Sequence, residues 1–212
     1  MKRKFVFYLS VSLVLFTLGI IIGLAEKAGM FDAFNTAVVK WASSTRSATL
    51  NSYFIAISKW TDTAHDIGYG LAVVVILALL KRWKEPLELF LSLLFAGISI
   101  EALKLSFKIP RPHFSWLVNA HSYSYPSGHS VGAVALYGML LYIVIKSNLP
   151  KVVSYTIGTF LTFFIFSIFY DRWYVGVHWG MDVIGGGIIG LACLLLALAI
   201  TQKMEKTKDG ME

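Results

Sequence analysis

The chain alternates long apolar runs with short charged segments. After Met1-Lys2-Arg3-Lys4, residues 5–24 are uncharged and mostly apolar, and at about 1.5 Å per residue they cover a hydrocarbon core of about 30 Å. Five further apolar runs follow, at about 67–80, 86–103, 127–146, 152–170 and 180–200. The pattern predicts an all-α integral membrane bundle of six transmembrane helices.

Residues 25–62 do not fit this pattern, because apolar and polar positions are mixed there. Phe31, Phe34, Val38 and Val39 recur at helical spacing, and Trp41, Tyr53 and Trp60 are scattered among polar groups. Aromatic rings prefer the headgroup level of a bilayer. We therefore expect an interfacial helical segment between the first two spans.

The first apolar run has an alternative interpretation as a signal peptide, since it has a basic start and small residues near Ala25. The apolar core of a signal peptide is only about 7–15 residues long. The run from 5 to 24 is longer, so we favour a retained helix.

Composition supports the membrane assignment. Of the 212 residues, 57% are hydrophobic and 15% are charged, whereas soluble domains are about 45–50% apolar. Lys and Arg (19) exceed Asp and Glu (12), but most of these cations flank apolar runs, so we expect a bilayer and no nucleic acid as partner. Cys193 is the only cysteine and excludes a disulfide framework. Residues 1–212 contain no linker or repeat, which favours a single domain.

The distribution of charge predicts the topology. Six spans put both termini on one side, and that side carries most of the 19 lysines and arginines. The positive-inside rule then places the termini in the cytoplasm. The segments 104–129 and 171–182 fall on the outer face, between spans three and four and between spans five and six.

Candidate chemistry begins in segment 104–129. Lys104 ends the third span, and Arg111 follows between Pro110 and Pro112, which favour an extended course. The two cations could converge on one anion. Alternatively, both are interfacial anchors that reach the headgroups.

Pro126-Ser127-Gly128-His129 marks the change from loop to helix. The first N–H groups of a helix have no helical partner and form an anion site together with the helix dipole. Gly128 leaves room for an anion to approach the backbone. The alternative is that Ser127 is only an N-cap, a common use of serine at this position.

The second cluster contains Arg172, His178 and Asp182. If the chain is helical from His178, Asp182 lies over the same face and accepts from one imidazole nitrogen. The other nitrogen is then a neutral nucleophile with an orienting partner. Alternatively, the pair only joins two helices. No carboxylate cluster with metal-ligand spacing accompanies these residues.

Together these pieces resemble the signature of the type 2 phosphatidic acid phosphatase (PAP2) family, which is related in its site to vanadium haloperoxidases. The family pattern is K-x6-R-P, then P-S-G-H, then S-R-x5-H-x3-D. This chain has Lys104-x6-Arg111-Pro112, Pro126-Ser127-Gly128-His129 and Arg172-x5-His178-x3-Asp182. One position departs, because Asp171 stands where the family has serine, and it either weakens phosphate binding by repulsion or braces Arg172.

The resemblance implies roles for these residues. Lys104, Arg111, Arg172 and the backbone at Ser127 and Gly128 hold the phosphoryl oxygens. His178, oriented by Asp182, attacks phosphorus to give a phosphohistidine, while His129 protonates the leaving oxygen and then activates water. The implied enzyme is metal-independent, needs no cofactor, and has a bell-shaped pH dependence of turnover.

The implied substrate is a lipid phosphate or diphosphate. Resemblance to bacterial members suggests phosphatidylglycerol phosphate or undecaprenyl diphosphate, and phosphatidic acid remains open. A lipid phosphotransferase would use the same residues. A serine protease dyad of Ser127 and His178 would leave the cations without a role, and a non-catalytic anion or lipid transporter would not need Asp182 beside His178.

The last apolar run carries Gly186 and Gly190, whose spacing is typical of close helix packing. Packing within the bundle accounts for it, and dimerisation is the alternative, so the oligomeric state stays open.

Overall fold

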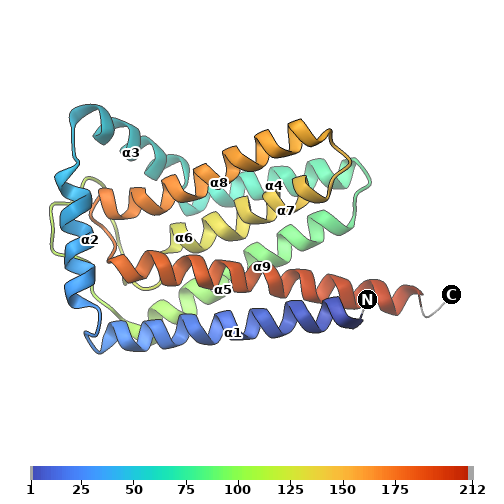
Figure 1. Cartoon of the computed structure of the whole chain (residues 1–212), viewed down its shortest axis with the longest axis horizontal. Helices are drawn as coiled ribbons and strands as arrows, with labels where there is room; N and C mark the ends of the chain where they lie inside the picture. The colour runs from blue at the N-terminus through green and yellow to red at the C-terminus, as the bar shows by residue number, and fades with distance from the viewer. Residues whose placement is uncertain (1, 210–212) are drawn as a thin grey trace.

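Figure 1 shows the computed structural model of the chain, which describes residues 2–209. All of its regular elements are helices: α1 (Lys2–Lys27), α2 (Asp32–Ser44), α3 (Ala48–Trp60), α4 (Thr63–Leu79), α5 (Lys84–Phe107), α6 (Gly128–Ala133), η1 (Val134–Gly138, one turn of π-helix), α7 (Met139–Lys146), α8 (Lys151–Tyr174) and α9 (Gly180–Asp209). The side chains of Lys2, Lys206 and Lys208, used in the charge count, lie outside the described part.

Five of the predicted spans correspond to segments long and apolar enough to cross a membrane: Arg3–Lys27, Lys84–Phe107, Gly128–Lys146, Lys151–Tyr174 and Gly180–Met204. The second span is different. Residues Ala48–Trp60 and His65–Leu79 qualify only as a pair bent by 56°, because the 17 residues of α4 are fewer than the roughly 20 that a bilayer requires. The described chain therefore has five or six candidate spans, and most of residues 25–62 form α2 and α3 at one end of the bundle (Figure 1).

Helix α9 is the central element of the bundle. It runs beside α1 for much of its length and also contacts α5, α6 and η1 (Figure 1). Ser12 Oγ of α1 donates to Ala192 O of α9 at 2.7 Å, and Tyr125 OH donates to Gly19 O of α1 at 2.5 Å. These contacts make α1 part of the packed bundle.

Two glycines of α9 allow the fourth span to approach closely. A Cβ atom at Gly186 would lie 2.9 Å from Ser127 O, and one at Gly190 would lie 2.6 Å from Val131 O. The small-residue face of α9 is therefore covered by α6 of the same chain. This packing holds the turn around Ser127 directly against α9.

Candidate active site

The loop between α5 and α6, residues 108–127, brings the two predicted clusters together. It folds over the end of the bundle, opposite the first turn of α1 and the last turns of α9 (Figure 1). Leu117 N donates to Val175 O at 3.0 Å, and Trp179 Nε1 donates to Pro110 O at 2.8 Å. The segments 104–129 and 171–182 thus meet at one end of the molecule.

A cavity of about 560 Å³ opens where they meet. Its walls include six of the eight predicted site residues, namely Lys104, Arg111, Gly128, His129, Arg172 and His178. The other two, Ser127 and Asp182, are fully buried behind the wall. Residues 118–122 of the loop, Gly97, Ile100 and Glu101 of α5, and Val177 complete the lining.

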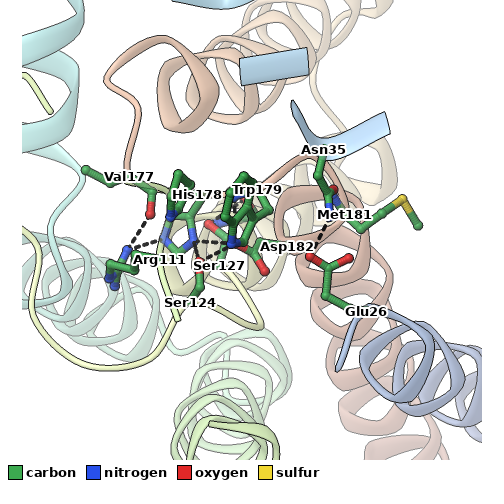
Figure 2. A network of polar contacts seen from close by, with 12 residues as sticks. Glu26, Asn35, Arg111, Ser124, Ser127, Val177, His178, Trp179, Met181 and Asp182 are labelled. Carbon is green, nitrogen blue, oxygen red and sulfur yellow. Dashed lines mark hydrogen bonds and ion pairs between the residues drawn. The ribbon is translucent and has the colours of Figure 1, made fainter. Parts of the chain in front are cut away.

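His178 lies between a carboxylate and a guanidinium (Figure 2). Its Nδ1 is 3.2 Å from Asp182 Oδ2, and its Nε2 is 3.2 Å from Arg111 Nη1. Arginine can only donate, so Nε2 is the acceptor and the proton of the neutral ring is on Nδ1, where it donates to Asp182. The expected contact is present, although α9 begins only at Gly180, so that His178 precedes the helix.

Asp182 has several partners besides His178. Its Oδ2 accepts from Trp179 N at 2.7 Å and from Ser124 Oγ, in the manner of a capping box at the start of α9. Its backbone oxygen accepts from Ser127 N at 3.0 Å. The hydroxyl of Ser124 is also 3.4 Å from His178 Nδ1. Ser124 was not predicted, because one serine in a polar loop carries no distinguishing pattern.

Arg111 is held mainly by backbone carbonyl groups. It donates to Val177 O at 2.8 Å, to His121 O at 3.0 Å and to Ser122 O at 3.1 Å. Lys104 Nζ donates to Ser122 Oγ at 3.1 Å. Since none of these partners is a carboxylate, both cations keep a net positive charge to offer an anion.

Arg172 has a different environment. It lies in the last turn of α8, where its Nε donates to Asp171 Oδ2 at 2.7 Å and its Nη2 contacts both Asp171 and Ser58 Oγ. Ser58 Oγ also donates to Asp171 Oδ2 at 3.0 Å. Of the two expectations for Asp171, repulsion of phosphate or bracing of the guanidinium, the contacts correspond to bracing. Ser58 of α3 was not predicted.

The polar groups of the turn at the start of α6 have more hydrogen-bond partners within the protein than expected. Ser127 is the N-cap, its Oγ accepts from Ser130 N at 3.4 Å and from Ser130 Oγ at 3.0 Å, and its N–H is bonded to Asp182 O. The backbone N–H of Ser127, which we predicted to bind phosphate, is thus already used, and Gly128 is the predicted backbone donor on the cavity wall. Ser127 Oγ pairs with Ser130 and not with His178 in the described structure, which argues against a protease dyad.

His129 is one residue further along α6. Its Nε2 is 3.4 Å from Ser58 O. Together with Arg172 it lines both the main cavity and a second one of about 500 Å³ beside α3. The two imidazoles, His129 and His178, therefore face the same space from α6 and from the loop before α9.

The surroundings keep His178 neutral. Burial lowers its pKa well below the ordinary value of 6.5, and the positive charges of Arg111, Arg172 and Lys104 lower it further. Within residues 2–209, no described group of three or more His, Cys, Asp and Glu side chains could hold a metal ion. A neutral imidazole, three cations and a second imidazole around one cavity can accommodate attack on a phosphoryl group.

Comparisons with known proteins agree with this chemistry. The PAP2 superfamily profile matches residues 85–206. Phosphatidylglycerophosphatase B of Bacillus subtilis (strain 168) is 28% identical over 207 residues, which cover 95% of this chain and 99% of that one. An undecaprenyl-diphosphatase of Sulfolobus acidocaldarius is 28% identical over 178 residues, covering 79% of this chain and 78% of the relative.

Among solved structures, a transmembrane PAP2 type phosphatidylglycerolphosphate phosphatase from Bacillus subtilis superposes with a TM-score of 0.78. The sequence identity is 26%, and the superposition covers 91% of this chain and 96% of that one. The likeness thus extends over the bundle as well as the matched motifs.

Proposed function

Because the chain belongs to the PAP2 superfamily and is a phosphoric ester hydrolase of the multi-pass membrane type, we propose that it removes phosphate from a lipid phosphate or diphosphate through a phosphohistidine intermediate. The observation that carries this proposal is the arrangement of His178. Its Nε2 faces a cavity whose walls also hold Lys104, Arg111 and Arg172, and its Nδ1 is bonded to Asp182.

In the first step, His178 Nε2 attacks phosphorus. A bound phosphoryl oxygen draws Arg111 Nη1 away from the imidazole, which frees the Nε2 lone pair. The N–P bond forms as the P–O bond to the lipid breaks, and the leaving oxygen takes a proton from His129. Charge on the equatorial oxygens is met by the three cations and by Gly128 N–H, so the reaction we propose is metal-independent.

In the second step, water attacks the phosphohistidine. His129, now neutral, takes a proton from the water, and the N–P bond breaks with its electron pair returning to Nε2. Inorganic phosphate leaves, and both histidines regain their starting protonation. Asp182 accepts from Nδ1 of His178 throughout and stabilises the positive charge that passes through this imidazole.

We further propose that residues 1–212 form one domain with both termini in the cytoplasm and the cavity on the outer face, as the charge distribution favours. The substrate then enters from the bilayer and leaves its chain in lipid. By analogy with the relatives, phosphatidylglycerol phosphate and undecaprenyl diphosphate are the first candidates, followed by phosphatidic acid.

The test is a phosphate-release panel over these three lipids with purified protein. Release of inorganic phosphate supports hydrolysis, while a newly phosphorylated acceptor without free phosphate supports the phosphotransferase alternative. Protein that moves anions across vesicles but acts on no lipid phosphate would instead be a transporter, and the proposal would fail.

The pKa of His178 predicts the pH dependence. The nucleophile is active only when neutral, and since its pKa is lowered below 6.5, activity is retained through neutral pH and is lost as pH falls further. In the substrate complex the negative charge of the bound phosphate holds the His129 proton, and loss of that proton gives an alkaline limb in kcat. We expect kcat/KM, which reports the free enzyme, to have its acid limb below pH 6.5. A rate that is flat across the range would contradict these roles.

A further inference from the structure

A buried polar network links α1 and α2 to the first turn of α9, beside His178 and Asp182 (Figure 2). Asn35 Oδ1 of α2 accepts from Met181 N at 3.0 Å, and Asn35 Nδ2 donates to Glu26 Oε1 of α1 at 2.7 Å. Asn35 and Glu26 are only 3% and 7% exposed. Both precede the residues matched by the PAP2 profile.

The orientation of the Asn35 amide follows from its partners. A backbone N–H can only donate, so the oxygen of Asn35 faces Met181 and its NH₂ group faces Glu26. Glu26 Oε1 must then accept. The carboxylate on α1 thus holds the amide on α2 in the one orientation that can cap α9.

Capping matters at this position because the first N–H groups of a helix lack helical partners. At the start of α9, the side chain of Asp182 accepts from Trp179 N within the same turn, and the side chain of Asn35 on α2 accepts from Met181 N. Asp182 therefore comes directly after Met181, whose backbone N–H is held by a residue of another helix.

The first turn of α9 carries two parts of the proposed site. The side chain of Asp182 is bonded to His178 Nδ1, and its backbone oxygen accepts from Ser127 N in the turn that precedes Gly128 and His129. A shift of this turn would move the support of the nucleophile and the start of α6 together. The cations Lys104 and Arg111 lie on other segments.

We propose that Asn35, held by Glu26, is a positioning residue for the phosphoryl-transfer site, acting through the first turn of α9 on Asp182 and His178. The proposal rests on the function proposed above. Misplacement by about 1 Å can cost about 10²-fold in rate. The loss falls mainly on kcat, and KM changes less, because Lys104 on α5 and Arg172 on α8 bind phosphate from helices outside this turn.

The experiment exchanges donor and acceptor between the two positions. In Asn35→Asp the new carboxylate still accepts from Met181 N, but it lies against the carboxyl group of Glu26. We expect kcat to fall at least about tenfold, which is within the roughly 10²-fold loss that misplacement by about 1 Å can cause. Glu26→Gln can still accept from Asn35 and should keep most of kcat. The double variant Glu26→Gln/Asn35→Asp restores a donor opposite an acceptor and should recover most of the activity lost in Asn35→Asp.

Ser12→Ala is the matched control, since it removes a buried α1–α9 hydrogen bond far from the first turn of α9. It should lower thermal stability without lowering kcat per folded molecule. Asn35→Ala removes both bonds without juxtaposing carboxyl groups, and it replaces Asn35→Asp if that variant does not fold.

The outcomes separate the two proposals. Loss of kcat that exceeds any change in KM in the Asn35 variants, with recovery in the double variant, supports positioning. Full kcat per folded molecule in Asn35→Asp or Asn35→Ala overturns it, as does a double variant no better than Asn35→Asp. Wild-type protein and His178→Ala in the same assay report the phosphatase reaction itself, so the positioning role can fail while the proposed function stands.

Discussion

Replacing His178 by alanine is expected to lower phosphate release by a factor of about 10⁴ or more. Among the described residues on the cavity wall, His178 is the proposed nucleophile, with one ring nitrogen facing the cavity and the other bonded to Asp182, and no other described residue takes over this role. The cations would still bind the lipid phosphate, so binding should survive while turnover is lost. Initial rates of phosphate release measure the first effect. Binding of labelled lipid to the variant in detergent measures the second.

The intermediate offers an independent readout of the same substitution. Wild-type protein quenched during turnover with ³²P-labelled lipid should carry an acid-labile label on His178, and His178→Ala should carry none. His113→Ala is a suitable control, since this histidine is exposed in the loop between α5 and α6 and is not part of the cavity lining. A His178→Ala variant that keeps most of its activity would eliminate the covalent mechanism.

Replacing His129 by alanine should have the second largest effect, and its size should depend on the leaving group. With a lipid phosphate, whose leaving oxygen needs a proton, we expect a loss of about 10²- to 10⁴-fold, typical of general acid catalysis. With nitrophenyl phosphate, whose leaving group needs no proton, formation of the phosphohistidine should be largely spared. Comparison of rates for the two substrates measures the difference.

Because His129 is also the proposed base of the second step, the variant should hydrolyse the phosphohistidine slowly. Nitrophenolate should then appear as a burst close to one equivalent per site, accompanied by label trapped on His178. Equal losses with both substrates and no burst would assign His129 a role in holding the substrate, not in proton transfer.

The residues around the cavity could be predicted from sequence because they occur in three motifs with definite spacing. Lys104, Arg111, His129, Arg172 and His178 all lie on its wall, although Arg172 belongs to the last turn of α8 and not to a loop. Apolar runs likewise indicated the spans, since a bilayer imposes a length that is visible in one dimension.

The supporting contacts could not be predicted in this way. Ser58 meets Asp171 across 113 residues of sequence, and Asn35 meets Met181 across 146. Neither serine nor asparagine in an interfacial segment has a periodicity that indicates its partner. Such contacts depend on where α2 and α3 cross the end of the bundle, which is decided by packing in three dimensions.

The bend between α3 and α4 was missed for a related reason. Hydropathy indicated an apolar run from 67 to 80, but it could not indicate that α3 would join α4 at 56° as part of a broken span. The contact between Ser58 and Arg172 depends on the position of α3, and hydropathy does not indicate that position.

The ion pair of Asp171 and Arg172 bears on how the enzyme finishes a catalytic cycle. Asp171 gives the guanidinium of Arg172 a counter-ion within the protein, so we expect inorganic phosphate to compete with this carboxylate for the same donors. We therefore expect product inhibition to be weaker than it would be without the carboxylate. The inhibition constant for inorganic phosphate should accordingly fall in Asp171→Ser, and an unchanged constant would mean that the pair has no part in product release.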